Sequence, residues 1–254
     1  MRAFVQAVLL SAASVALPIM ANAADLPIQK APPAPPPLTW SGFYLGVHGG
    51  AGFGAKTFDY NDLSPAAPFR WDSSVSVNGP LGGGQIGLNW QAGWVVLGVE
   101  GEGSYADISG HGFCNTTVFF VNCSARTSSL AAVTGHLGAA VDKAMVYVKG
   151  GAAWARDSLT IANVAMPPAT IAFSSSLSDT RVGWTLGMGV EYMLLPCWSL
   201  KLEYDYMDFG TKRYNFASSS TIVPAETFTN WDVSQRLHVM TIGINYHLGD
   251  VPAY

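Results

Sequence analysis

Acidic and basic side chains at alternate positions are the residues whose types and spacing could do chemistry in this chain. Glu100 lies two residues from Glu102, and Glu203 lies two residues from Asp205; residues two apart point to the same side of a β-strand. The ionisable residues on segments with strand character are His48, Glu100, Glu102, His136, Lys149, Glu191, Lys201, Glu203 and Asp205. Carboxylates that meet such bases can transfer protons, guide ions, or form ion pairs that hold an interior together.

A lipid-modifying hydrolase is the enzymatic interpretation, and it requires a nucleophile, a base and an orienting acid within hydrogen-bond reach. The histidines that could be the base are His48, His111, His136, His238 and His247. No G-x-S-x-G motif occurs, and His238, which shares its parity with outward apolar residues, has no evident serine partner. The glycines at 82–84 precede a strand and not a helix, which argues against a phosphate loop. We therefore expect no enzyme, no cofactor and no metal site.

The three cysteines indicate a disulfide better than a metal site. Cys114 and Cys123 flank eight residues of a loop-like segment, and this spacing suits a local disulfide in an exported protein. Cys197 is left over, and no Cys or His stands at ligand spacing around it.

Period-two alternation predicts the elements that position these side chains. Between Phe43 and Phe53, odd positions are mostly apolar, whereas even positions carry Tyr, Gly and His. A strand separates two such faces and a helix would mix them. The same pattern predicts strands at residues 43–53, 84–91, 94–105, 129–141, 145–155, 181–192, 199–207 and 237–248. Most of these are near the length of about 9 to 11 residues with which a tilted strand crosses a bilayer.

The connections between these segments alternate in length. Those after the second, fourth and sixth strands are short, whereas the others are long and polar, at 55–80, 107–126, 156–180 and 210–235. Bacterial outer-membrane barrels have short periplasmic turns and long outer loops. The sequence therefore predicts an all-β fold, an eight-stranded antiparallel transmembrane up-and-down β-barrel, in the outer membrane. A soluble barrel is the alternative, but its outward face should be richly charged.

Aromatic residues fall near the ends of the predicted strands, where membrane interfaces are expected. The periplasmic girdle comprises Trp40, Phe43, Trp90, Trp94, Tyr192, Trp198 and Tyr246. The outer girdle comprises Phe53, Tyr105, Trp154 and Phe209.

The N-terminal residues predict export. Arg2 precedes an uncharged, mostly apolar run that ends in the small-residue cleavage site Ala21-Asn22-Ala23, so residues 1–23 are predicted to be a signal peptide. Residues 24–39 carry six prolines and are predicted to be a periplasmic linker. The barrel is expected at 40–248, followed by a C-terminal extension at 249–254.

The composition argues against three other classes of protein. Charged residues are 12% of the chain, the net charge is −4 and there is no basic patch, so nucleic-acid binding is not expected. Aromatic residues reach 12%, which argues against disorder. After residue 23 no apolar run reaches the length of about 18 residues that a spanning helix needs.

Four stretches resemble the small porin-like outer-membrane proteins of alpha-proteobacteria, often called outer-membrane immunogenic proteins. They are W-S-G-F-Y-L-G from Trp40, L-G-V-E-G-E from Leu97, G-W-T-L-G-M-G-V-E-Y from Gly183 and W-S-L-K-L-E-Y-D-Y-M-D-F-G from Trp198. The resemblance implies an eight-stranded barrel with a structural or surface-antigen role and no established catalysis. Such barrels often end in a strand with a terminal aromatic, whereas here residues 249–254 follow the last strand.

The expected function follows from the width of the lumen. An eight-stranded barrel leaves an interior just wide enough for side chains, so the ionisable residues should form an ion-paired lumen network. Arg181 is expected at its rim and Lys56 in a loop. We expect a structural and surface-antigen role; the alternatives are a narrow porin and, third, a lipid-modifying enzyme. Expected partners are outer-membrane lipids including lipopolysaccharide, the barrel assembly machinery, and host or surface ligands of the outer loops.

Overall fold

Eight strands make up the fold. The computed structural model describes residues 38–62, 69–115, 120–163, 174–217 and 227–248. The strands are β1 (Gly42–Asp62), β2 (Phe69–Ala92), β3 (Val95–Asn115), β4 (Phe120–Val141), β5 (Ala144–Asn163), β6 (Ser174–Leu195), β7 (Trp198–Ala217) and β8 (Thr227–His247). The predicted signal peptide, residues 24–37 of the linker and the C-terminal extension lie outside the described residues.

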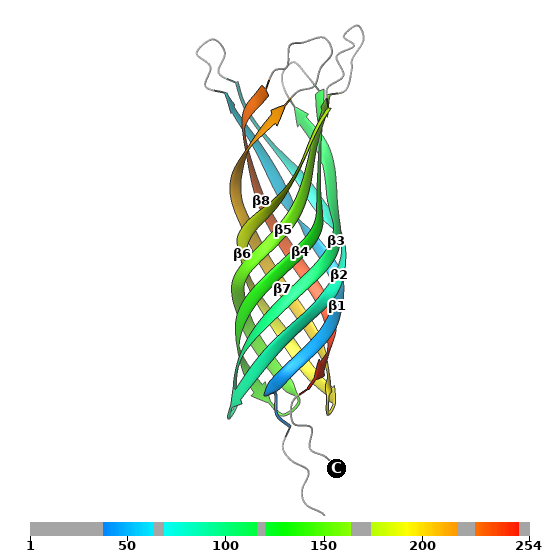
Figure 1. Cartoon of the computed structure of the whole chain (residues 1–254), viewed down its shortest axis with the longest axis vertical. Coiled ribbons are helices and arrows are strands. Elements are labelled where there is room, and N and C mark those ends of the chain that lie inside the picture. Colours follow the sequence, from blue (N-terminus) through cyan, green and yellow to red (C-terminus); the bar gives the residue numbers. More distant parts are fainter. Residues whose placement is uncertain (1–37, 63–68, 116–119, 164–173, 218–226, 249–254) are drawn as a thin grey trace, which may run out of the picture. The chain divides into compact units, whose positions relative to one another are not determined.

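The strands close into an antiparallel barrel in which each pairs with its neighbours along the chain and β1 pairs with β8 (Figure 1). The predicted up-and-down eight-stranded topology is therefore confirmed. Two-residue connections join β2 to β3, β4 to β5 and β6 to β7, and we call this the turn end and the opposite one the distal end. Gly93 and Asp142 adopt positive φ angles of 64° and 52° in the first two of these turns. Within the described ranges, no helix with the length and apolar character to span a membrane is found.

The strands are longer than the sequence pattern predicts, at 20 to 24 residues each. The segments predicted as the long loops 55–80, 107–126, 156–180 and 210–235 largely continue the strands, so that prediction is wrong. A strand of this length is about twice what crossing a bilayer requires. The barrel therefore extends well beyond one bilayer thickness at its distal end.

The distal strand extensions escape prediction because the apolar face changes sides. In β8, Met240, Ile242 and Ile244 point outward and are 44 to 56% exposed, whereas Val233, Leu237 and Val239 point inward and are buried. The alternation with a period of two continues along the whole strand. The apolar side chains occupy the outward-facing positions in its turn-end part and the inward-facing positions in its distal part. A pattern that requires one constant apolar face therefore ends each strand where this exchange occurs.

A β-bulge adds a second irregularity in β4. The register with β5 shifts between Thr127 and Ser129. Toward the turn end of this bulge the buried residues have even numbers, as at Leu130 and Ala132, whereas beyond it they have odd numbers, as at Cys123 and Ala125. An extra residue in a strand turns the following side chains to the other face, so the bulge decides which residues of distal β4 face outward.

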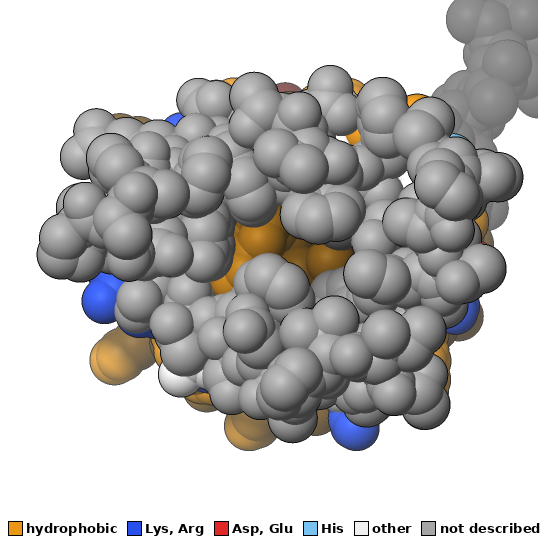
Figure 2. Space-filling model, turned by 90° about the horizontal axis from the view of Figure 1, so that it is seen from above, with side chains coloured by type: hydrophobic (Ala, Val, Ile, Leu, Met, Phe, Trp, Pro, Cys, Tyr) orange, Lys and Arg blue, Asp and Glu red, His pale blue; other side chains and the backbone are white. Residues whose placement is uncertain are grey.

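The interior has an apolar cluster toward each end and a polar region between the two, and further buried polar groups lie beside both clusters. Near the turn end, six buried residues form a cluster that we call the turn-end plug: Trp40, Val96, Ala140, Met145, Tyr147 and Met193. In the distal half a larger buried cluster, the distal core, includes Phe58, Val77, Ile108, Leu159, Phe209 and Leu237. Viewed along the barrel from the distal end, the central opening exposes hydrophobic side chains (Figure 2).

Two of the predicted girdle residues have other roles. Trp40 is 1% exposed and belongs to the turn-end plug, and Phe209 is 5% exposed within the distal core. Trp40 precedes β1, so its ring can fold over the barrel mouth and contact the ring of His247 edge-on, with centroids 5.7 Å apart. Phe209 lies on the inward parity of β7 beside Met207. The other predicted girdle residues are not part of either cluster.

Candidate functional site

Two lysines and four carboxylates meet at mid-lumen in a group that we call the lysine–carboxylate network. Lys149 Nζ lies 3.2 Å from Asp205 Oδ2, 3.3 Å from Glu203 Oε1, 3.5 Å from Glu102 Oε2 and 3.8 Å from Glu100 Oε1. Lys201 Nζ lies 3.0 Å from Glu100 Oε2 and 2.9 Å from Glu203 Oε2. These side chains come from β3, β5 and β7, and all but Glu102 are buried. The sequence-predicted pairing of acids and lysines therefore occurs.

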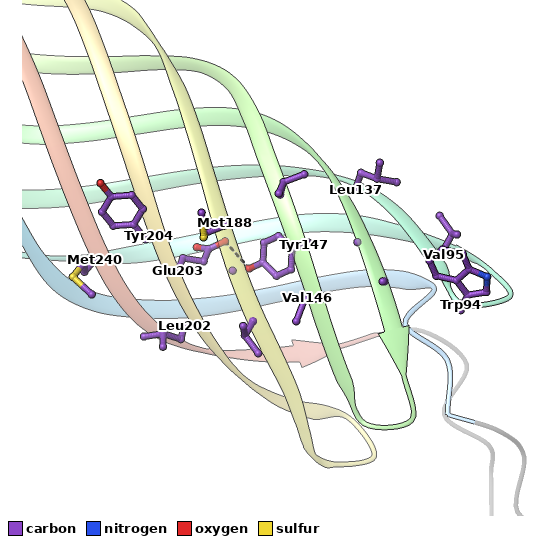
Figure 3. A pocket seen from close by; sticks show the side chains of 15 residues that line it. Trp94, Val95, Leu137, Val146, Tyr147, Met188, Leu202, Glu203, Tyr204 and Met240 are labelled. Carbon is purple, nitrogen blue, oxygen red and sulfur yellow. Dashed lines mark hydrogen bonds between the residues drawn. The ribbon is translucent and has the colours of Figure 1, made fainter.

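Tyrosine hydroxyls complete the network. Tyr44 donates to Glu100 Oε2 at 2.8 Å, and Tyr147 donates to Glu203 Oε1 at 2.7 Å (Figure 3). Each ring lies over a glycine of the neighbouring strand: a Cβ added at Gly87 would come within 2.3 Å of Tyr44, and one at Gly189 within 2.4 Å of Tyr147. Glycine in these strands therefore makes room for an aromatic ring in a narrow lumen.

The two predicted lumen histidines bind neutral side chains and not the carboxylates. His48 Nδ1 lies 2.6 Å from Gln85 Oε1, and its Nε2 lies 2.7 Å from Ser104 Oγ. His136 Nε2 lies 2.8 Å from Asn89 Oδ1. Gln85 and Asn89 are not among the site residues that the sequence predicts, although both lie at inward-facing positions of β2. These histidines extend the polar lumen without adding to its ion pairs.

Glu191 belongs to a separate group near the turn end. Its Oε1 accepts hydrogen bonds from Ser199 and from Asn245 Nδ2, the latter at 2.7 Å, and lies 3.3 Å from His247 Nε2. Ser199 Oγ lies 2.8 Å from the same nitrogen of His247. Ser199, His247 and Glu191 thus meet. The Ser199 hydroxyl, however, donates its hydrogen bond to the Glu191 carboxylate. Glu191 also approaches Nε2 of His247, the nitrogen that would have to accept the serine proton if His247 were a catalytic base. In a catalytic triad the acid binds the other ring nitrogen.

A second buried charge group, which sequence reasoning missed, lies within the distal core; we call it the Lys56 cluster. Lys56 Nζ lies 2.8 Å from Asp157 Oδ1 and 3.2 Å from Thr127 Oγ1, and Lys56 is fully buried. The prediction of Lys56 as a loop residue is therefore wrong, because β1 continues past it on the inward parity. The sequence does contain a sign that the strands continue into the distal half: apolar residues also alternate with a period of two at Trp231, Val233, Leu237 and Val239.

Arg181 also differs from its prediction as a rim partner of the lumen acids. It is 2% exposed and donates to two backbone carbonyls, those of Gly210 at 2.8 Å and Val233 at 2.7 Å. It also donates to Gln235 Oε1 at 3.5 Å. Within the described residues no carboxylate forms an ion pair with it. Gln235 contacts both Arg181 and Asp157, so Arg181 lies beside the Lys56 cluster and not with the lumen acids.

Three carboxylates of the lysine–carboxylate network, those of Glu100, Glu102 and Glu203, lie within 4.8 Å of one another. Such a group of oxygens could ligate a hard cation. The ammonium groups of Lys149 and Lys201 contact all three carboxylates and supply two positive charges in the space that a cation would occupy. The arrangement is that of an ion-paired core.

Cysteine placement corrects one prediction and leaves another open. Cys114 lies in β3 and Cys123 in β4, so neither belongs to a loop. The register pairs Cys114 with Val121, two residues along β4 from Cys123. Cys123 is disulfide-bonded and Cys197 is a free thiol. The side chain of Cys114 lies outside the described residues, so its bond to Cys123 stays a prediction.

The turn-end half of the barrel carries an apolar outer surface. Among the outward side chains there, Val47, Ile86, Val99, Val133, Leu186 and Ile242 are each 56 to 66% exposed. A hollow of about 850 Å³ is lined by outward apolar residues, among them Leu137, Val146, Met188 and Leu202, and also by the lumen residues Tyr147 and Glu203 (Figure 3). An apolar band outside a polar lumen is the arrangement of a transmembrane barrel.

Comparison with known families decides what kind of barrel this is. Residues 8–247 match the sequence profile of the outer membrane protein beta-barrel domain. The chain belongs to this outer-membrane β-barrel family. The turn end is accordingly the periplasmic end, and the distal end lies outside the cell.

Relatives of this outer-membrane barrel include named surface proteins. The chain is 27% identical to the 31 kDa outer-membrane immunogenic protein of Brucella melitensis, over 95% of this chain and 99% of that protein. It is 30% identical to the 22 kDa outer membrane protein of Rhizobium leguminosarum bv. viciae, over 74% and 73% of the two chains. The resemblance to immunogenic proteins is thus confirmed.

Among solved structures, the outer membrane protease OmpT of Escherichia coli superposes with a TM-score of 0.52. The alignment covers 82% of this chain and 97% of OmpT, at 9% sequence identity. This similarity concerns the barrel fold alone.

Exposed charges on the extracellular half of this outer-membrane barrel mostly occur as pairs. Arg213 donates to both carboxylate oxygens of Asp232, at 2.8 and 2.9 Å, and these hydrogen bonds lower the pKa of the Asp232 carboxyl. The other exposed pairs are Lys212–Asp179 at 2.5 Å, Arg126–Asp107 at 3.0 Å and Arg236–Asp208 at 3.5 Å. Isolated surface pairs of this kind contribute little to stability.

Proposed function

We propose that this outer-membrane barrel is a non-enzymatic structural and surface-antigen protein whose lumen does not conduct. The observation that carries the proposal is the order of layers in the lumen. The turn-end plug lies at the periplasmic mouth, the lysine–carboxylate network at mid-lumen, and the distal core toward the cell exterior. A continuous water column would have to pass two largely apolar layers, in which an ion loses hydration water, and the charges inside the distal core, Lys56 and Asp157, already pair with each other.

The geometry of the Glu191 group supports the non-enzymatic part of the proposal. Ser199 is fully buried, and Trp40 packs against the His247 ring beside it. A lipid substrate would need an open path to the serine hydroxyl and an oxyanion-binding site beside it. His238, the outward-facing histidine, binds the hydroxyl of Tyr204 through Nδ1 at 2.6 Å and stacks on Phe53. Neither neighbour is a serine or threonine that histidine could activate.

The names of the relatives support the surface-antigen part. The Brucella melitensis relative that covers 95% of this chain is called an outer-membrane immunogenic protein. The partners that we infer are outer-membrane lipids including lipopolysaccharide, the barrel assembly machinery during insertion, and surface or host ligands that meet the extracellular end. A barrel with a closed lumen can bind lipids, the assembly machinery and surface ligands, because all of these partners contact its outer surface.

Planar-bilayer recording of the refolded full-length protein tests the proposal. We expect no steady conductance from the wild-type barrel. A defined single-channel current whose ion selectivity changes in the Lys201→Met variant would overturn the proposal and establish a narrow pore. The same recording with the Lys143→Met variant is the matched control, because Lys143 is exposed in the turn between β4 and β5.

A further inference from the structure

Two outward arginines stand side by side on the extracellular β4–β5 surface. Arg126 pairs with Ser158 of β5 in the register, and Arg156 of β5 pairs with Ser129 of β4. The arginines are thus diagonal neighbours, which are about 7 to 8 Å apart, with a somewhat shorter distance between their Cβ atoms. Both are exposed, and Arg126 faces outward only because the β4 bulge between Thr127 and Ser129 changes the parity of the strand.

Arg156 differs from the other exposed cations of the extracellular half. Among the described residues there, Lys212, Arg213, Arg126 and Arg236 each lie within 4.0 Å of a carboxylate. Arg156 has no such partner in the described part of the chain, so its charge is free for an external anion. Two adjacent guanidinium groups, one of them uncompensated, present several N–H donors in the planar geometry that binds phosphate oxygens.

The chemistry of this face changes in order along the strands. Val133 and Val148 belong to the apolar band, at 58 and 56% exposure. The aromatic residues Tyr105, 86% exposed, and Trp154 come next, and the register places Tyr105 and Arg156 on either side of Ser129. Aromatic rings of this kind are typical of the membrane interface. The arginine pair therefore lies just outside the apolar band, at the depth of lipid headgroups.

A polar groove continues this order beyond the arginines. Its volume is about 300 Å³, and Ser109, His111, Ser124, Arg126, Ser158 and Thr160 line it. The register aligns His111, Ser124 and Thr160 in one row across β3, β4 and β5, and Ser109, Arg126 and Ser158 in the next. Rows of hydroxyl groups that donate and accept hydrogen bonds match the hydroxyl groups of a sugar.

We propose that the β3–β4–β5 face binds a phosphorylated glycolipid of the outer leaflet, with a phosphate between Arg126 and Arg156 and a sugar in the groove. The apolar band, the arginine pair and the hydroxyl-lined groove then face the acyl chains, the phosphate and the sugar in the order in which such a lipid presents them. The inference rests on the proposed function, in which the barrel binds its partners through its outer surface. It adds which part of that surface binds the lipid.

Binding measured by calorimetry with refolded full-length protein in detergent tests the assignment, with bisphosphorylated lipid A as the probe. We expect Arg156→Gln to weaken lipid A binding by about tenfold or more, because a charge-assisted contact is lost. Asp107→Asn should strengthen it, because Asp107 competes with the phosphate for Arg126. The control Arg236→Gln removes an exposed cation on β8 and should change the affinity by less than about twofold.

Ligand controls distinguish a glycolipid site from simple charge attraction. Dephosphorylated lipid A should bind wild-type protein at least as weakly as lipid A binds Arg156→Gln, because it loses the contacts to both arginines, and inorganic phosphate or phosphatidylglycerol should bind more weakly than lipid A. Equal losses in Arg156→Gln and Arg236→Gln, or equal affinities for lipid A and phosphatidylglycerol, would overturn the proposal. Heat-dependent migration on SDS gels verifies that each variant is folded. A conducting lumen would contradict the proposed function alone, whereas an unchanged lipid A affinity in Arg156→Gln would contradict this inference alone.

Discussion

Replacement of Lys201 by methionine is the most direct perturbation of the lumen. Methionine keeps an unbranched apolar chain but removes the ammonium group. Glu100 and Glu203 then lose contacts of 3.0 and 2.9 Å, and their remaining ammonium contact is Lys149, at 3.8 and 3.3 Å. Four carboxylates that shared two ammonium groups are left with one. Because Glu100, Glu203 and Asp205 are buried, water cannot replace the missing charge without opening the lumen.

The expected loss of stability is about 3 to 5 kcal/mol, the usual cost when one partner of a buried ion pair is removed. Each 1.4 kcal/mol corresponds to about a factor of ten, so the unfolding equilibrium constant should rise between about a hundredfold and several thousandfold. If water filled the lumen, screening would reduce the cost to that of a surface pair, about 1 kcal/mol or less. The magnitude therefore distinguishes a dry ion-paired lumen from a water-filled one.

Urea unfolding of the refolded barrel in phospholipid vesicles, followed by tryptophan fluorescence, measures this loss. The midpoint should fall with an unchanged slope. Lys143→Met is the matched control and should stay within about 0.5 kcal/mol of wild type, because Lys143 is exposed. In the Lys201→Met/Glu100→Gln double variant, roughly half of the loss should be recovered, because the glutamine still accepts from Tyr44 without an unpaired charge. Equal midpoints for Lys201→Met and Lys143→Met would refute the reasoning.

Three further predictions follow from other parts of the barrel. Lys56→Met should lower stability by about 3 to 5 kcal/mol in the same assay, because it leaves Asp157 buried without its cation; a loss no larger than that of Lys143→Met would contradict the buried pair. The Cys114→Ser/Cys123→Ser double variant should still insert and fold, with a loss of roughly 2 to 3 kcal/mol at most; mass spectrometry that finds both thiols free in protein isolated from cells would disprove the bond. Trp40→Ala should destabilise the barrel by about 3 to 5 kcal/mol, since a large buried ring is lost, and still give no steady conductance in bilayers, because the distal core remains; a steady current would place the seal at Trp40 alone.

The membrane half of the molecule could be predicted because one face of each strand must be apolar there. Lipid surrounds this half, so residues such as Val133 and Ile242 must be apolar and alternate with lumen residues. The alternation identified the eight strands, their order and the inward parity of Glu100, Lys149, Lys201 and Glu203. Inward parity in a narrow barrel was enough to predict that these acids and bases would meet.

The extracellular half was predicted wrongly as loops because its environment is different. Outside the membrane, water and not lipid contacts the barrel, and the apolar residues, such as Phe58 and Val233, turn inward. Lys56, Arg181 and Phe209 were assigned to the wrong places for this one reason. The bulge in β4 likewise depends on how two neighbouring strands fit together, which a single segment does not reveal.

The sequence by itself determined the number of strands, their topology and which side chains of the membrane half face inward, because alternation with a period of two is a local property. Only the tertiary structure decided which acid pairs with which lysine, that Trp40 closes the periplasmic mouth, and that Lys56 finds Asp157 across the barrel. These contacts join residues that are far apart in the sequence. Barrel closure, strand register and bulges set their distances, and all three depend on the whole sheet at once.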